Sequence, residues 1–246
     1  MKQSRFVRQS TADTITVNGY SERGIINAFV FSCMQNVQIA KEWIAFLLEN
    51  QVSAENINNI SMYVEQSLSD FGDPDLMIKF KNSSNGNESL IFVEAKVKTW
   101  SKTKWKNCQK EFDKFEKKQS SNLIQQLGLK IELVNHLGDA QSEKGYLIMD
   151  EKIRCDKNIE NKKRKTGNSP IIKEILNIFS SIKDFYYVAI VPNYSGKEKI
   201  NSDIISQIQF ITWEKLKDFA ECKKLTLVQE TFKYNNPNND DKGQIY

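Results

Sequence analysis

The sequence predicts an α/β protein with a mixed central β-sheet that is flanked by helices on both sides. Two observations predict this class. Short runs such as residues 90–97 (LIFVEAKV) and 185–193 (FYYVAIVPN) are largely apolar at both odd and even positions, as expected of strands covered on both faces. Segments with apolar residues at helical spacing alternate with these runs along the chain.

The N-terminal part is expected to be helical after a polar lead over residues 1–20. Glu22 would then lie in the first turn of a helix, where the helix dipole favours a carboxylate. Residues 24–50 carry apolar side chains at helical spacing and predict one long helix or two, with a break near Gln35–Asn36. A second helix is expected over about residues 54–68.

A β-hairpin is predicted next. Residues 75–80 (DLMIKF) and 90–97 are apolar runs, and the polar segment between them contains Asn-Gly, a strong turn signal. The remaining expected elements, in chain order, are helix over 105–137, strand over 145–150, a polar and basic loop over 154–170, a helix that starts at Pro170, strand over 185–193, strand over 207–213, helix over 214–221 and a frayed tail over 234–246.

Composition excludes several kinds of site. The chain has 246 residues, a formal net charge of +4 and a single histidine, His136. One histidine excludes His-rich metal sites and leaves no clear Ser–His–Asp or Cys–His set. The four cysteines are scattered with no C-x-x-C pair, which argues against a disulfide framework and a zinc cluster: Cys33, Cys108, Cys155 and Cys222. Catalysis would therefore have to use carboxylates, lysines and a metal ion.

No targeting or membrane signal is found in the sequence. No window approaches eighteen consecutive apolar residues, and the polar N-terminus lacks the apolar stretch of a secretory signal. We therefore expect a cytoplasmic protein with no membrane partner. Without internal repeats or a convincing linker, one domain over residues 1–246 is the preferred organisation.

Two segments hold a large share of the basic residues, 96–118 and 152–165. Solvated surface is the plain interpretation of either charge run. In the first segment, however, Trp100 and Trp105 lie among the lysines, as in surfaces that contact backbone phosphates and a base or sugar.

Charged residues gather at one end of the predicted hairpin. If Phe80 lies roughly opposite Leu90, Asp75 falls opposite the stretch Glu94–Lys96. Glu94 and Lys96 are two residues apart and therefore project from the same face of their strand. One interpretation is a structural ion pair at a strand end. The other is a site in which carboxylates and an ammonium group converge on a ligand, since buried charges need partners or a metal.

The full arrangement favours the second interpretation. Pro74-Asp75, an apolar strand, a turn and a second apolar strand that ends in Glu94-Ala95-Lys96 resemble the signature of the PD-(D/E)xK nuclease superfamily, which has the restriction-endonuclease-like fold. The resemblance covers roughly residues 20–215. In one respect the sequence departs from it: the family core usually has a strand before the aspartate strand, and none is found between Leu68 and Asp75. Residues 14–17 (TITV) are one option for that strand.

The resemblance implies a Mg²⁺-dependent endonuclease acting on DNA, with Mn²⁺ as a substitute ion. Asp75 and Glu94 supply the hard oxygen ligands that Mg²⁺ prefers, and the carbonyl of Ala95 is the third expected ligand. Lys96 would orient and help to deprotonate the attacking water, or stabilise the charged transition state.

Further site residues follow from looser matches. Glu22 corresponds to a glutamate on a helix before the sheet and would hold a second ion or orient a water. Gln125 and Gln126 match a glutamine on the helix after the lysine strand, and Gln126, directly before Leu127, fits the Gln-Leu pattern better; a surface position is an equal alternative for it. The lysines that follow the active strand are expected to contact the nucleic-acid backbone: Lys98, Lys102, Lys104, Lys106 and Lys110.

The expected role is a bacterial restriction or anti-phage defence nuclease that acts alone, as a homodimer or as a subunit of a larger defence complex. Alternatives within the fold are a DNA repair or recombination nuclease and an RNA nuclease. The alternative from another class is a nucleic-acid-binding protein that does not cleave, although intact Asp75, Glu94 and Lys96 argue against a degenerate site.

Overall fold

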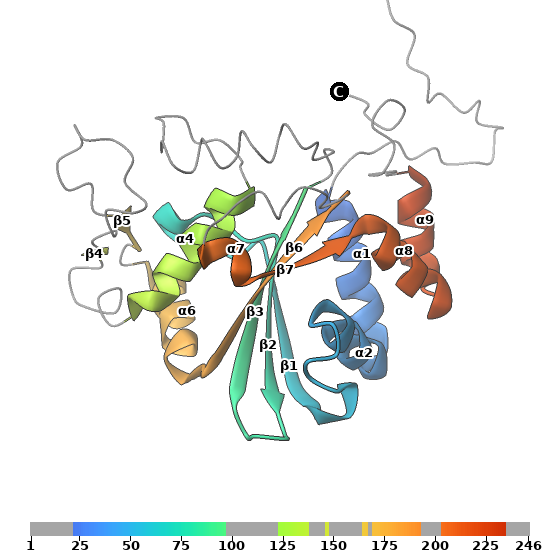
Figure 1. Ribbon diagram of the computed structural model, residues 1–246, viewed down its shortest axis with the longest axis horizontal. Helices are drawn as coiled ribbons and strands as arrows, with labels where there is room; N and C mark the ends of the chain where they lie inside the picture. Colours follow the sequence, from blue (N-terminus) through green and yellow to red (C-terminus); the bar gives the residue numbers. More distant parts are fainter. Residues whose placement is uncertain are drawn as a thin grey trace, which may run out of the picture.

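The computed structural model describes residues 22–96, 123–137, 146–147, 164–166, 169–192 and 203–234. In these parts of the chain a five-stranded sheet lies between two groups of helices (Figure 1). The protein is therefore an α/β protein with helices on both faces of a mixed sheet, as the sequence predicts.

The strand order in the sheet is β1-β2-β3-β6-β7. β2 pairs antiparallel with both β1 and β3, whereas β3, β6 and β7 run parallel. The strands span Ile57–Val64 (β1), Leu76–Asn82 (β2), Glu88–Ala95 (β3), Asp184–Val191 (β6) and Ile208–Thr212 (β7). β3 is central and buried along nearly its whole length, which explains its continuous apolar run.

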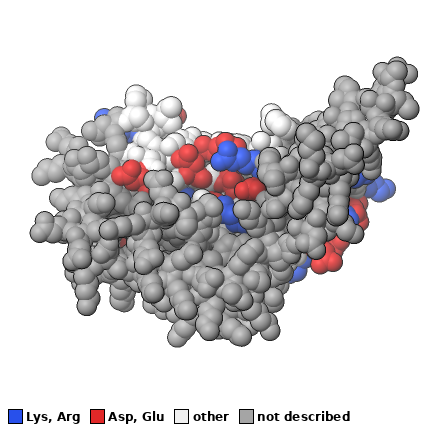
Figure 2. All heavy atoms as spheres, turned by 90° about the horizontal axis from the view of Figure 1, so that it is seen from above, with Lys and Arg blue, Asp and Glu red and all other residues white. Residues whose placement is uncertain are grey.

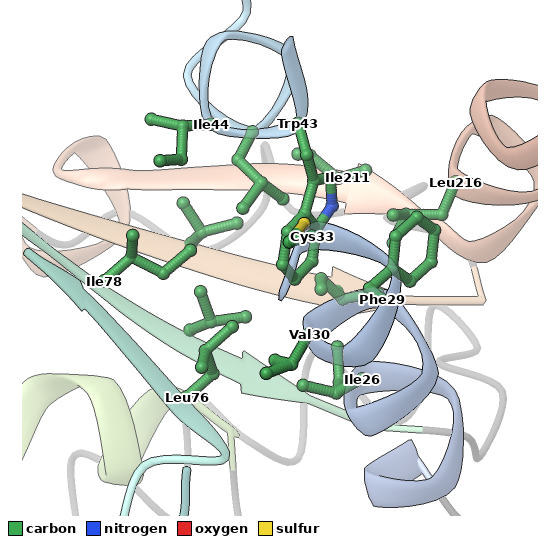
Figure 3. Packing of buried hydrophobic residues seen from close by; sticks show 14 of the residues in the cluster. Ile26, Phe29, Val30, Cys33, Trp43, Ile44, Leu76, Ile78, Ile211 and Leu216 are labelled. Atoms are coloured by element: carbon green, nitrogen blue, oxygen red, sulfur yellow. The ribbon is translucent and has the colours of Figure 1, made fainter. Parts of the chain in front are cut away.

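One face of the sheet is covered by α1 (Glu22–Gln35), α2 (Val37–Leu47), α8 (Trp213–Cys222) and α9 (Thr226–Tyr234). Phe29 of α1 stacks on Trp43 of α2 with ring centroids 4.8 Å apart. Both rings are fully buried and belong to a core that includes Leu76 and Ile78 of β2 (Figure 3). We call this side the α1 face.

The opposite face carries α4 (Leu123–Asn135), α6 (Pro170–Ser181) and the short α7 (Asp203–Ser206). Its core contains Leu123 and Leu127 of α4, and Phe92 of β3 lies among aromatic rings from α6 and β6. We call this side the α4 face. Each face of the sheet thus has its own hydrophobic core.

Several predicted boundaries are confirmed. The helical segment breaks at Asn36, whose Oδ1 accepts a hydrogen bond from the Gln38 amide at 2.9 Å and so caps α2. Pro170 begins α6 directly after the capping Ser169. The hairpin strands and the strands at 185–193 and 207–213 are also found, as is the helix that follows them.

The helix predicted over residues 54–68 is wrong. Only Ala54–Asn56 form a short 3₁₀ helix (η1), and β1 follows it. The register between β1 and β2 shifts between Asn58 and Ser61, and Asn59 has a φ of 51°, so the strand contains a bulge. The extra residue puts Ile57 and Ile60 on the same side, a spacing of three that imitates a helix.

Other differences are smaller. Of the strand expected over 145–150, Tyr146–Leu147 (β4) are described; they pair with Arg164–Lys165 (β5), inside the expected basic loop, as a separate two-stranded sheet. Tyr234 ends α9, a helix that was not predicted, and does not belong to a frayed tail. The lead over 1–20 and the first half of the helix expected over 105–137 lie outside the described residues. None of the described helices is long and apolar enough to cross a membrane.

Candidate active site

The β2–β3 hairpin sets the geometry of the candidate site. Leu76 pairs with Val93, so extending the antiparallel register by one residue puts Asp75 opposite Glu94. Phe80 pairs with Ser89 and not with Leu90, one residue away from the expected register. Asp75 nevertheless falls within the predicted stretch, beside the end of β3.

Strand alternation directs both carboxylates to the α4 face. Met77 and Phe92, which pair across the hairpin, both belong to the core on that face. Asp75 and Glu94 are each two residues further along and share the same side of the sheet. Asp75 is 6% exposed and Glu94 is 1% exposed.

Direct contacts hold these groups together. Lys96 Nζ donates a hydrogen bond to Glu94 Oε1 at 2.7 Å. The amide of Ala95 donates to Asp75 Oδ2, also at 2.7 Å. The end of β3 is fixed in turn, because the indole Nε1 of Trp213 donates to the carbonyl of Lys96 at 2.9 Å. The three residues Asp75, Glu94 and Lys96 therefore meet as the sequence predicts.

The carboxyl group of Asp75 is electrostatically unfavourable in its ionised form. Burial, together with the neighbouring charge of Glu94, raises its pKa to about 7, although Lys96 and the Ala95 amide oppose the shift. Burial and the charge of Glu94 thus outweigh the stabilisation that Lys96 gives to the ionised carboxyl group of Asp75.

The N-terminus of α1 lies at the same end of the sheet. Glu22 is half-buried, and its charge also acts on Asp75. Arg23, which was not predicted as a site residue, places Nε 3.8 Å from Asp75 Oδ1 and Nη1 3.3 Å from Glu65 Oε2. More than half of the Arg23 side chain is exposed, so water screens this pair and the pKa of Asp75 remains raised.

The residues present fit a hard divalent cation. Glu94 Oε2 is buried and forms no hydrogen bond, so an acceptor is left open in the site. Within a strand, the N–H and C=O of one residue point toward the same neighbouring strand. Because the amide of Ala95 points toward Asp75, its carbonyl does so too. The parts of the chain that the structure describes hold no group of three or more His, Cys, Asp or Glu residues suited to a metal. Two carboxylates and a carbonyl are what this site offers.

Helix α4 adds two polar residues. Gln126 is half-buried, and its Oε1 has no hydrogen-bond partner. Lys130 follows four residues later and therefore lies on the same side of the helix. The side chain of Gln125 is outside the described residues, so the choice between the two glutamines stays a prediction.

Lys130 is the most unusual of these residues. Its side chain is completely buried, and its Nζ forms no hydrogen bond. Burial lowers its pKa, and the carboxylates of Glu94 and Asp75 oppose this effect while Lys96 adds to it. A Cβ added at Gly72, which has a φ of +73°, would lie 3.3 Å from Nζ, so the chain passes close to the ammonium group there.

One signal in the sequence could have identified Lys130. The segment after Gln126 is apolar on nearly all sides, with Leu127, Leu129 and Ile131 all buried. A lysine inside such a helix has no exposed side to occupy. Its spacing of four from Gln126 then directs it toward the same site.

The end of the sheet that carries the site shows acidic and basic side chains close together in the middle of the molecule (Figure 2). The lysines expected to contact nucleic acid all lie outside the described residues: Lys98, Lys102, Lys104, Lys106 and Lys110. Comparison of the chain with protein-family models, curated proteins and solved structures finds no match.

Proposed function

We propose that the protein is a metal-dependent nuclease that hydrolyses phosphodiester bonds in DNA. The observation that carries the proposal is the meeting of two buried carboxylates, Asp75 and Glu94, with the ammonium group of Lys96 at the end of the central hairpin. Hydrolysis of a phosphodiester needs positive charge near the phosphate and an activated water, and such a set can supply both with a bound divalent ion.

A purely structural ion pair explains fewer of the contacts in the site than a metal site does. It explains the contact between Lys96 and Glu94 Oε1. It leaves Glu94 Oε2 without a hydrogen bond and a second buried carboxylate, Asp75, beside the first. Burying two carboxylates together is costly unless a cation relieves their repulsion.

In this proposal Asp75, Glu94 and the carbonyl of Ala95 hold Mg²⁺, with Mn²⁺ as a substitute. Bound there, the ion would neutralise charge on the phosphate and acidify a water molecule. Lys96, fixed by its bond to Glu94, orients the attacking water or stabilises the negative charge that develops on the phosphate. Glu22, whose charge acts on Asp75, and Gln126, whose buried Oε1 has no hydrogen-bond partner, would position a water or a phosphate oxygen.

The fold is compatible with this function. β1 supplies a strand before the aspartate strand, the element of the restriction-endonuclease-like core that the sequence did not reveal. A restriction or anti-phage defence enzyme is the biological role that the resemblance to PD-(D/E)xK nucleases suggests.

A cleavage assay tests the proposal directly. Plasmid, linear and single-stranded DNA, and RNA as a comparison, are incubated with the protein in Mg²⁺, Mn²⁺ or EDTA. We expect DNA cleavage with Mg²⁺ or Mn²⁺ and none in EDTA. Asp75→Asn and Lys96→Ala should each lower the rate by at least about 100-fold, because each removes a group that acts on the reacting atoms.

The hairpin itself offers a matched control. Lys79 Nζ lies 2.6 Å from Glu88 Oε2 on the same two strands, near the turn. Lys79→Ala therefore breaks a comparable ion pair far from the site and should cleave like the wild type. Cleavage that persists in EDTA, or in both Asp75→Asn and Lys96→Ala, would contradict the mechanism. Binding of DNA without any cleavage would instead favour a non-cleaving nucleic-acid-binding protein.

A further inference from the structure

Lys130 brings a second lysine to the candidate site from a separate element. The charged groups that act on it are the carboxylates of Glu94, Asp75 and Asp73 and the ammonium group of Lys96. Glu94 exerts the largest of these electrostatic effects. Lys130 thus acts on the two proposed metal ligands from α4, and its Nζ lies close to the backbone at Gly72, three residues before Asp75.

The contact pattern differs from that of a buried structural salt bridge. Such a pair offsets the cost of desolvation only through direct hydrogen bonds between its charges. Here Lys130 Nζ and Glu94 Oε2 are both buried, and each lacks a hydrogen-bond partner. The two groups thus interact through space and not through a hydrogen bond, and each keeps an open hydrogen-bonding position.

The charges of the least exposed groups indicate what kind of ligand could occupy these open positions. Among them, the two lysines Lys96 and Lys130 equal the two carboxylates Asp75 and Glu94 in number. Asp73 and Glu22 also act on the site, but they are more exposed, so water screens their charges. A divalent cation added to this set gives it an excess of positive charge. In a site removed from water, this excess is unfavourable unless an anion joins the cation.

We propose that Lys130 makes cation binding at this site conditional on an anionic phosphodiester. A divalent cation held by Asp75 and Glu94 is repelled by Lys130, and the negative charge of the substrate removes that repulsion. The metal and the substrate then bind with positive coupling, each raising the affinity for the other. Lys130 is in this sense a positioning residue that acts through the two carboxylates. The inference rests on the proposed nuclease function, since it assumes that Asp75 and Glu94 hold the metal.

Calorimetric titration with Mg²⁺ measures the coupling without any catalysis. The probe is dimethyl phosphate, a phosphodiester monoanion that resists hydrolysis, and trimethyl phosphate is the neutral control of similar size. In the wild type we expect dimethyl phosphate, but not trimethyl phosphate, to tighten Mg²⁺ binding by at least about fivefold. In Lys130→Met, Mg²⁺ alone should bind at least about tenfold more tightly than in the wild type, and dimethyl phosphate should add little.

Lys79→Met is the matched control, because it removes a lysine that is paired near the hairpin turn. It should behave like the wild type. Methionine keeps the length of the Lys130 side chain in an apolar core, and Lys130→Gln provides a second variant that should likewise bind Mg²⁺ more tightly than the wild type.

Equal Mg²⁺ affinities in the wild type, Lys130→Met and Lys130→Gln would overturn the inference and leave the nuclease proposal standing. An effect of dimethyl phosphate that survives in Lys130→Met would overturn it too. Absence of Mg²⁺ binding in all of these proteins, with and without dimethyl phosphate, would overturn the nuclease proposal and the inference together.

Discussion

The side chain of Lys130 is fully buried without a hydrogen bond, so it lowers the stability of the metal-free protein. We expect Lys130→Met to raise the free energy of unfolding by about 1–3 kcal/mol, because burial acts on this ammonium group more strongly than the attraction of Glu94. Urea denaturation in EDTA at pH 7.5 measures the change. A loss of stability would instead identify Lys130 as a structural partner of the carboxylates.

Asp75 gives the metal-free protein a characteristic dependence on pH. Its pKa is raised from 3.8 to about 7, so between these values the folded protein takes up a proton that the unfolded chain does not. The contribution of Asp75 to the free energy of unfolding is therefore fully present below about pH 4. It is lost as the pH rises through 7, and the loss reaches up to about 4 kcal/mol.

The variant Asp75→Asn carries the neutral form at every pH. We therefore expect it to be more stable than the wild type at pH 7.5 in EDTA, and the difference to shrink as the pH falls toward 5. Denaturant midpoints at several pH values give the comparison. Asp218→Asn, which changes an exposed carboxylate of α8, is the control and should show no such trend. A difference that grows toward low pH would contradict the raised pKa.

The residues of the hairpin could be predicted because their positions follow from local rules. A period of two and a clear turn signal suffice to bring Asp75 to Glu94 and to put Glu94 and Lys96 on one face. Lys130 was missed because the local signals, its apolar neighbours and its spacing of four from Gln126, do not specify how α4 packs on the sheet. Arg23 was missed for the same reason, since its contact with Asp75 joins the start of α1 to the start of β2.

At the scale of elements, α8 anchors the end of β3. The indole of the fully buried Trp213 donates to the carbonyl of Lys96. Trp213→Phe should lower the free energy of unfolding by about 1–3 kcal/mol more than Trp43→Phe does. Trp43 is equally buried, but its Nε1 has no hydrogen-bond partner to lose.

Denaturant unfolding of the two variants measures this difference in stability. If the site acts as proposed, Trp213→Phe should also slow DNA cleavage, since the backbone of Lys96 loses its anchor, while Trp43→Phe should not. Equal effects of the two substitutions on stability and rate would show that the anchor is unimportant.

β1 shows why one element escaped prediction. It lies at the edge of the sheet and is only half-covered, so its sequence carries Asn58, Asn59 and Ser61 among the apolar residues. The bulge then removes the period of two that identifies a strand. Edge strands and bulges are defined by their partner strand, and the partner is not visible in a local segment.

At the scale of the molecule, the two cores share one sheet and should unfold together. Phe92 lies on the α4 face, with its ring centroid 5.6 Å from Phe179 and 5.7 Å from Tyr187. The buried tryptophans Trp43 and Trp213 lie on the α1 face. Phe92→Leu should lower the free energy of unfolding by about 1–2 kcal/mol. The unfolding midpoints followed by tryptophan fluorescence and by far-UV circular dichroism should then shift by the same amount. Two separate transitions would contradict the prediction of a single domain.

The general architecture was predictable because β3 and β6 are apolar at both parities, which requires cover on both faces. The order of the strands was not, because parallel pairing of β3 with β6 joins segments almost a hundred residues apart in the sequence. Long-range pairing depends on the packing of the whole chain.

The separation of Lys130 from the hairpin also affects the order in which the site assembles during folding. Asp75, Glu94 and Lys96 come together when a short hairpin closes, an event on the microsecond scale in simple systems. Lys130 arrives only when α4 packs on β3, a contact of longer sequence separation that forms more slowly. A nascent chain whose helix has not yet docked thus holds the acidic half of the site without its second lysine.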